Sequence, residues 1–177
     1  LEGAGLVWIG VRQERMLVRQ FGCLLQLGAA FMFVESVFYP VGSNFFLNSY
    51  FLGCCFVALG PLFSAYWLDR SQTELQKWES FHSPFLFCIG FIALYLGGLR
   101  EVETHLGSAD EPLGFLLYVT VTSVLISVCS RKLAWNRLTL ATLFQLVFMV
   151  VLCFFEVMNG ARIHLLEGYN SAAWGLA

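Results

Sequence analysis

Residues 112–130 read PLGFLLYVTVTSVLISVCS, nineteen positions without a charged side chain. Residues 50–68 read YFLGCCFVALGPLFSAYWL, again nineteen positions without a charge. An α-helix needs about 20 mainly apolar residues to cross the hydrocarbon core of a bilayer, because each residue adds about 1.5 Å. Both stretches are too uniform for strands of an outer-membrane barrel, in which apolar and polar residues alternate. They therefore predict membrane-spanning α-helices.

The composition of the whole chain agrees with this prediction. Of its 177 residues, 58% are hydrophobic, 16% are aromatic and 12% are charged. Soluble domains carry about 25% charged residues, which they need to cover their surface. The composition therefore excludes an ordinary cytosolic enzyme, a nucleic-acid-binding protein and a disordered chain.

The sequence predicts an all-α, polytopic transmembrane helix bundle in which residues 1–177 form one segment. The approximate spans, about six in number, are 1–11 (partial), 16–39, 50–68, 84–106, 112–130 and 138–158. Residues 171–177 are expected to start a further helix, and the first and last helices are expected to be truncated. A buried helix of a water-soluble protein is the alternative for any single run, but this many runs in one small chain disfavour it.

The longest connection between the expected spans is residues 69–83. Residues 71–74 read SQTE, which has the spacing of a helix capping box. Leu75, Trp78 and Phe81 follow at three-residue steps among polar neighbours. This pattern predicts a short helix on the membrane surface, and a solvated loop is the alternative.

The basic residues predict the orientation in the membrane. Eight of the ten lie in the first, third and fifth connections: Arg12, Arg15, Arg19, Arg70, Lys77, Arg131, Lys132 and Arg137. Only Arg100 and Arg162 lie on the opposite side. Because Lys and Arg accumulate in cytoplasmic loops, the connections at 12–19, 69–83 and 131–137 are predicted to be cytoplasmic.

The other interfacial residues fit this orientation. Four acidic residues share the basic side: Glu14, Asp69, Glu74 and Glu79. The tryptophans that fall beside the basic residues are Trp8, Trp67, Trp78 and Trp135. The tyrosines that fall at the opposite ends of the spans are Tyr39, Tyr50 and Tyr169. Such belts of Trp and Tyr are typical of the two membrane interfaces.

The cysteines and histidines do not form a motif that holds a metal or a cofactor. The six cysteines lie within the predicted spans, without a CxxC pair, and are interpreted as small buried hydrophobic residues. Glu101 and His105 are four residues apart and share a helix face, which could hold a metal. Interfacial polar residues without a ligand role are the favoured interpretation, and we expect no metal or cofactor.

Several polar residues lie inside or at the edge of the predicted spans, where charges are costly and usually face a bundle interior or an aqueous cavity. Glu2 precedes Arg12 by ten residues, about 15 Å along a helix and near the midplane. The candidate members of a polar cavity that opens outward are Glu2, Glu35, Arg100, Glu103, His105 and Glu156, with Arg162 as a further member. Ordinary helix-end charges in contact with water are the alternative for all of them except Glu2.

Two uncharged polar residues, Gln26 and Gln145, lie in the middle of predicted spans. Glutamine side chains within a membrane form hydrogen bonds between helices. We expect both residues to take part in such interhelical bonds.

The first residues, LEGAGLVWIGVRQ, resemble the "LEGA-LVWLG-RQ" segment of the bacterial membrane proteins called domain of unknown function 2339. Further segments resemble this family in the same order. They are RQFG at 19–22 with QL at 26–27, NSYFL at 48–52 with FSA at 63–65, LGGLRE at 96–101 with ETHL at 103–106, and RKL at 131–133.

The resemblance implies a long, multi-pass protein of the bacterial inner (cell) membrane, of which this chain would be an internal piece. It implies the lipid bilayer and the remainder of the same chain as partners, and no nucleic acid. The family's activity is unknown by its own name, so the resemblance supplies no catalytic residues. The segments around Glu2 and at Leu96–His105 carry the resemblance and also hold candidate polar residues.

Two functions are favoured from the sequence, and a sensor that couples to a partner is a third possibility for which no signalling domain is visible. The first is a non-enzymatic membrane module with a structural or transport-related role, favoured because no nucleophile–base or metal motif is present. The alternative is an envelope enzyme that acts on lipid-linked or glycan substrates at the outer face. Glu35, Glu103 and Glu156 would then be acid/base or metal-holding groups. Clustering of these acids around one outward cavity would favour transport or catalysis.

Overall fold

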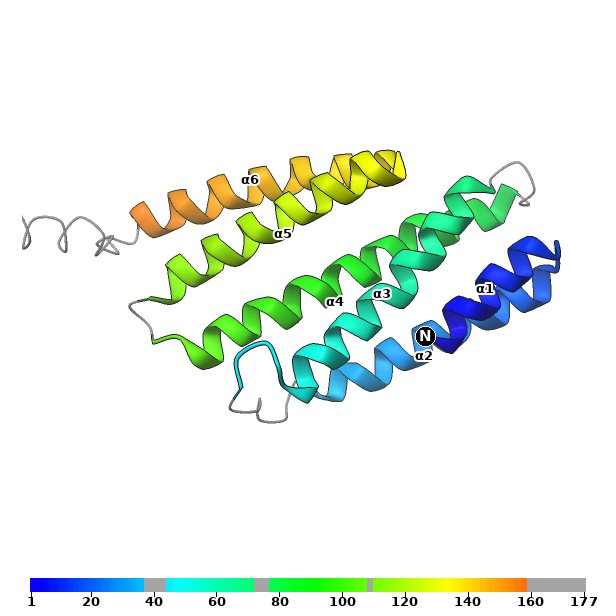
Figure 1. The fold of residues 1–177 in the computed structure, drawn as a ribbon, viewed down its shortest axis with the longest axis horizontal. Coiled ribbons are helices and arrows are strands. Elements are labelled where there is room, and N and C mark those ends of the chain that lie inside the picture. Colours follow the sequence, from blue (N-terminus) through cyan, green and yellow to red (C-terminus); the bar gives the residue numbers. More distant parts are fainter. Residues whose placement is uncertain (37–43, 72–76, 108–109, 159–177) are drawn as a thin grey trace, which may run out of the picture. The chain divides into compact units, whose positions relative to one another are not determined.

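The computed structural model describes residues 1–36, 44–71, 77–107 and 110–158, and the side chains of Glu35 and Glu156 lie outside this description. The described residues form helices and contain no β-strand. The helices, drawn in Figure 1, are α1 (Glu2–Arg12), α2 (Met16–Ser36), α3 (Ser49–Arg70), the 3-10 helix η2 (Lys77–Phe81), α4 (His82–His105), α5 (Glu111–Leu133) and α6 (Asn136–Met158). The all-α prediction is confirmed. The chain divides into two compact units, Leu1–His105 and Leu106–Ala177.

The observed helices follow the predicted spans closely. Four described stretches are long and apolar enough to cross a membrane: Met16–Val34, Ser49–Arg70, Glu79–His105 and Glu111–Leu133. The described part of α6 holds a shorter apolar helix, Asn136–Val151, and α1 has 11 residues. Residues 37–39 of the second predicted span and the helix expected at 171–177 lie outside the described residues.

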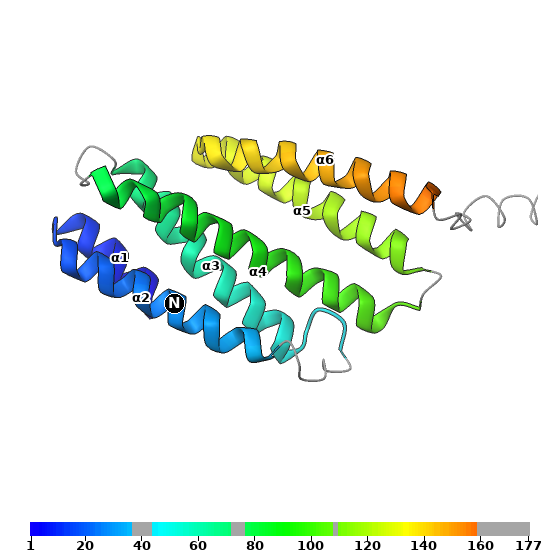
Figure 2. The ribbon, with the colours of Figure 1, turned by 180° about the vertical axis from the view of Figure 1, so that it is seen from behind.

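In the first unit, α1 and α2 form a tight hairpin (Figures 1 and 2). The chain reverses at Glu14, which has a positive φ of 56°, and the Arg15 N–H donates to the Gly10 carbonyl over 2.9 Å. The two backbones touch at glycines. A Cβ on Gly22 would lie 2.6 Å from the carbonyl oxygen of Gly3, closer than real Cβ atoms approach. This hairpin therefore depends on the absence of side chains at its crossing.

The second hairpin of the first unit pairs α3 with α4. The Asn48 side chain caps α3 by accepting a hydrogen bond from the Phe51 N–H at 2.8 Å. Gly90 of α4 lies against α3, because a Cβ there would meet the Ala58 carbonyl oxygen at 2.7 Å. Helix α3 also contacts α1 and α2, so it joins the two hairpins. The turn between α1 and α2, the carboxyl end of α3 and the amino end of α4 lie at the same end of this unit (Figure 2).

The second unit contains the hairpin of α5 and α6. Ala134 ends α5 in the left-handed conformation, with φ and ψ both 47°. The hydroxyl oxygens of Ser130 and Thr139 lie 2.7 Å apart across the turn. Gln145 is 2% exposed, and within the part of the chain that the structure describes neither atom of its amide has a hydrogen-bond partner.

Large hydrophobic side chains cover the outside of both units. Leu17 is 80% exposed, Phe31 is 73% exposed and Phe144 is 73% exposed. A water-soluble monomer rarely exposes continuous apolar surface of this kind. Together with the four long apolar helices, this surface is compatible with a membrane protein.

Candidate functional site

The carboxyl end of α4 holds a fully buried carboxylate, Glu101, which is 0% exposed. Its Oε2 accepts a hydrogen bond from the Phe46 backbone N–H at 3.1 Å, and its Oε1 accepts one from Asn48 Nδ2 at 2.6 Å. Asn48 is also the N-cap of α3. Glu101 therefore ties the start of α3 to the end of α4. The segment that it holds is bent, since Phe46 has a positive φ of 57°.

His105 lies one helical turn beyond Glu101. Its Nδ1 lies 3.6 Å from Glu101 Oε2 and 3.0 Å from the Glu101 carbonyl oxygen. The Phe45 ring packs edge-on against the imidazole, with 5.3 Å between ring centroids. The shared face predicted for Glu101 and His105 is thus confirmed. No third His, Cys, Asp or Glu joins them to form a metal-ligating group among the described residues.

The two neighbouring candidates on α4 lie in different surroundings. The Arg100 guanidinium lies over the Tyr50 ring of α3, 5.8 Å from its centroid. Glu103 is exposed. Glu101 and Glu103 differ in burial because two residues are about 200° of rotation around an α-helix. The sequence placed Glu103 and not Glu101 among the cavity candidates, whereas it is Glu101 that the structure buries.

The opposite end of the first unit holds a buried ion pair. Arg19 of α2 is 5% exposed and Glu79 of η2 is 2% exposed. The guanidinium makes two hydrogen bonds to the carboxylate, Nε to Oε1 at 3.2 Å and Nη2 to Oε2 at 2.9 Å. Nη1 donates to the Gly10 carbonyl at 3.1 Å, and Gln20 Nε2 donates to Glu79 Oε1 at 3.3 Å. The ion pair thus joins α1, α2 and η2, with the guanidinium reaching α1 and the carboxylate belonging to η2.

This ion pair corrects the interpretation of the connection at 69–83. The sequence placed Glu79 among the polar neighbours of a surface helix, but residues 77–81 form a 3-10 helix that buries Glu79. The predicted capping box at 71–74 lies largely outside the described residues. One signal could have identified Glu79: it directly precedes the apolar run of α4, and the candidate span begins at this residue.

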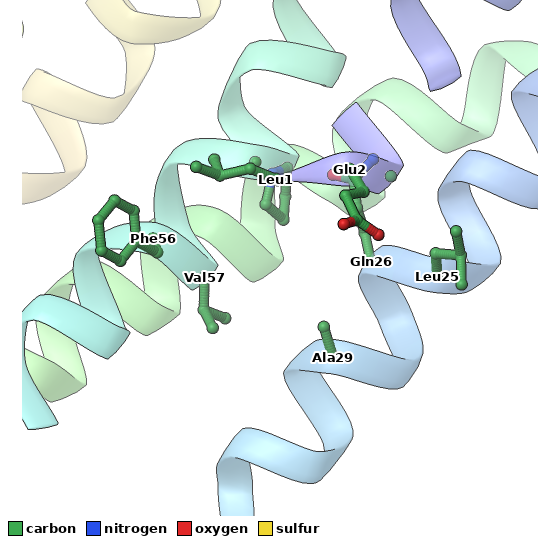
Figure 3. A pocket seen from close by; sticks show the side chains of 10 residues that line it. Leu1, Glu2, Leu25, Gln26, Ala29, Phe56 and Val57 are labelled. Atoms are coloured by element: carbon green, nitrogen blue, oxygen red, sulfur yellow. The ribbon is translucent and has the colours of Figure 1, made fainter. Parts of the chain in front are cut away.

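A pocket of about 560 Å³ lies between the amino end of α1 and helices α2 and α3 (Figure 3). Its walls consist of Leu1, Glu2, Gly3, Leu25, Gln26, Ala29, Phe56, Val57, Gly60 and Pro61. The Glu2 side chain is exposed, and Figure 3 shows it beside Gln26. Most of the wall is apolar, so Glu2 supplies its charge.

Gln26 at the base of this pocket makes the predicted interhelical contact. Its Nε2 donates to Ser64 Oγ of α3 at 2.9 Å and to the Gly22 carbonyl at 3.3 Å. Ser64 in turn donates to the Gly60 carbonyl at 3.1 Å. The prediction is confirmed for Gln26. For Gln145 it is wrong in the described structure, where that amide is buried without a bond.

The candidates that the structure describes do not all line the pocket beside α1, and the outward cavity stays a prediction. Glu2 lines the pocket beside α1, whereas Arg100, Glu103 and His105 lie near the carboxyl end of α4 and line no part of it. The side chains of Glu35 and Glu156, and the whole of Arg162, lie outside the described residues. The cysteines are also not uniformly buried: Cys23 and Cys54 are, but Cys88, Cys129 and Cys153 are exposed on helix surfaces.

Comparison with known proteins adds no relative. No family model, no curated protein and no solved structure matches the chain.

Proposed function

We propose that this chain is a non-enzymatic structural module of a multi-pass membrane protein. One observation carries the proposal. The charged side chains that are buried among the described residues, Arg19, Glu79 and Glu101, all bond to neighbouring elements. Charges that serve transport or catalysis would face a cavity, whereas these three hold helix ends together.

We also propose in which membrane the chain lies, how it is oriented there and to which family it belongs. We propose the bacterial inner membrane, with the turn between α1 and α2 and the connection between α3 and α4 in the cytoplasm. The distribution of basic residues supports this orientation. The ordered motifs between residues 1 and 133 support membership of the domain of unknown function 2339 family. Alkaline phosphatase fused after Gly107 should be active, and fused after Ser71 it should be inactive. The opposite pattern would reverse the orientation.

A transport-related role has the pocket beside Glu2 in its favour, because a carboxylate in an apolar wall within a span could bind a cation or a proton. An envelope enzyme has His105 in its favour, because this imidazole is 16% exposed and lies beside a buried carboxylate. Each alternative therefore depends on a different residue, and substitutions can separate them.

The test uses Glu2→Gln, Arg100→Ala, Glu103→Gln and His105→Ala in the full-length protein. Each variant is scored for its level in the membrane and for rescue of a deletion strain. If the chain is a structural module, each of the four variants should rescue the deletion strain in proportion to the amount of that variant in the membrane. Normal level with lost rescue for Glu2→Gln would replace the proposal by transport, and the same result for His105→Ala would replace it by catalysis.

A further inference from the structure

Aromatic rings and arginines form a continuous array at the end of the first unit where α1 and α3 finish. The Arg12 guanidinium lies over the Trp8 ring, 5.7 Å from its centroid, and Trp8 packs edge-on against Trp67 with 6.5 Å between centroids. Trp67 meets Tyr66 at 5.9 Å, and the Arg70 guanidinium lies 5.0 Å from the Tyr66 centroid. We name these five residues the basic–aromatic array.

The exposed charges described at this end of the unit are predominantly positive. Arg12, Arg15 and Arg70 are exposed. The nearby carboxylate of Glu79 is buried against Arg19, and that of Asp69 accepts a hydrogen bond from Ser83 Oγ of α4. Glu14 is the exposed acid of the α1–α2 turn. Among the residues that the structure describes at this end, three arginines and one carboxylate are therefore exposed.

The composition of the array matches a particular depth in a bilayer. Trp and Tyr side chains concentrate at the level of the lipid headgroups, where one end of the ring is apolar and the other is wet. A guanidinium stacked on such a ring uses its planar face, and the N–H donors lie around the edge of that plane. Edge donors of arginine are well suited to phosphate oxygens, which they can bind in pairs.

We propose that the basic–aromatic array, together with Arg15, binds the headgroup of an anionic phospholipid. The inference rests on the proposed membrane location of the chain. The rings set the depth of the two stacked arginines, and the arginines supply the charge that selects an anionic headgroup over a zwitterionic one. The buried Arg19 takes no part, because Glu79 neutralises it.

The test measures lipid selectivity by quenching of tryptophan fluorescence. Trp78, Trp135 and Trp174 are replaced by Phe in the full chain, so that Trp8 and Trp67 remain as reporters within the array. The protein is reconstituted in phosphatidylcholine vesicles, and brominated phosphatidylcholine or brominated phosphatidylglycerol is introduced in parallel series. The proposal requires stronger quenching by the brominated phosphatidylglycerol at equal lipid fractions.

Variants then assign the selectivity to the array. Arg12→Gln and Arg70→Gln should each lower the preference for phosphatidylglycerol about fivefold. The matched control is Lys132→Gln, which removes a positive charge from the second unit and should leave the preference unchanged. Inorganic phosphate added to the buffer should not compete, because the site takes the lipid-borne group at the depth of the rings.

The outcomes separate this proposal from the proposed function. Equal quenching by the two brominated lipids, or loss of selectivity in the Lys132→Gln control alone, would overturn the anionic-lipid site and leave the membrane location standing. Absence of quenching by both lipids would overturn the membrane location itself. If one of the two arginine variants fails to fold, the other still gives its own selectivity ratio.

Discussion

Arg19 on α2 and Glu79 in η2 form a buried ion pair in which two N–H groups of one side chain meet both oxygens of the other. Removing one partner of a buried pair leaves an uncompensated charge, whereas replacing both by apolar residues is often tolerated. We expect Arg19→Met or Glu79→Leu alone to lower the free energy of unfolding by about 3–5 kcal/mol. The double variant should recover most of this loss.

A double-mutant cycle of denaturant unfolding in detergent micelles measures this coupling. Additive losses in the double variant would show that the two side chains act independently and would contradict the structural role assigned to the pair. The Lys132→Gln variant serves as a control for the loss of a single positive charge.

The second prediction concerns the crossing of α1 and α2. Gly22→Ala would place a Cβ 2.6 Å from the Gly3 carbonyl oxygen, so the two backbones must separate. We expect a loss of about 1–3 kcal/mol in unfolding free energy. Gly28 lies on the same helix with no atom within 4 Å of the added Cβ, and Gly28→Ala should be neutral or stabilising. Equal effects of the two substitutions on thermal unfolding would contradict the close approach.

The third prediction concerns the carboxylate at the end of α4. Glu101→Gln replaces one of two acceptor oxygens by an NH₂ group, which would oppose either the Phe46 N–H or Asn48 Nδ2. We expect faster hydrogen exchange of the Phe46 amide and a loss of about 1–3 kcal/mol in stability. Glu103→Gln is the matched control, because Glu103 is exposed two residues further along. Unchanged exchange at Phe46 in the Glu101 variant would show that this carboxylate does not hold the segment.

The fourth prediction compares two buried glutamines. Gln145→Leu should leave stability unchanged or raise it, because the native amide is buried and has no hydrogen-bond partner among the described residues. Gln26→Leu should lower stability by about 1 kcal/mol, because it removes the bonds to Ser64. Thermal unfolding of both variants in the same detergent tests the difference. A larger loss for Gln145→Leu would mean that its amide has a partner in the membrane.

The helices were predictable from the sequence because their signal is local. The charge-free run at 112–130 predicted α5, observed over Glu111–Leu133, to within three residues at either end. The run at 50–68 did the same for α3. A stretch of this length and apolarity has few other stable conformations in a bilayer, since every backbone N–H and C=O must be satisfied within it.

The polar contacts were less predictable because their partners are distant in sequence. Glu79 lies 60 residues from Arg19, and Glu101 lies 53 residues from Asn48. The sign of the charge and the expected depth in the membrane were enough to select candidate residues from the sequence. The packing of α3 against α4 then determines that Glu101 is buried and Glu103 is exposed. Gln26 and Gln145 also show that position within a span does not predict the bonding partner. Both lie in the middle of a span, yet among the described residues the Gln26 amide forms hydrogen bonds and the Gln145 amide does not.

The separation of Arg19 and Glu79 along the chain has a consequence for biosynthesis. A ribosome adds about 5–20 residues per second, so Arg19 is made about 3–12 s before its partner 60 residues later. During this interval the guanidinium has no Glu79 to neutralise it. Arg19 therefore reaches its final, buried environment only after α3 has been completed. The order of synthesis thus makes the arrival of η2 the step that completes the burial of Arg19.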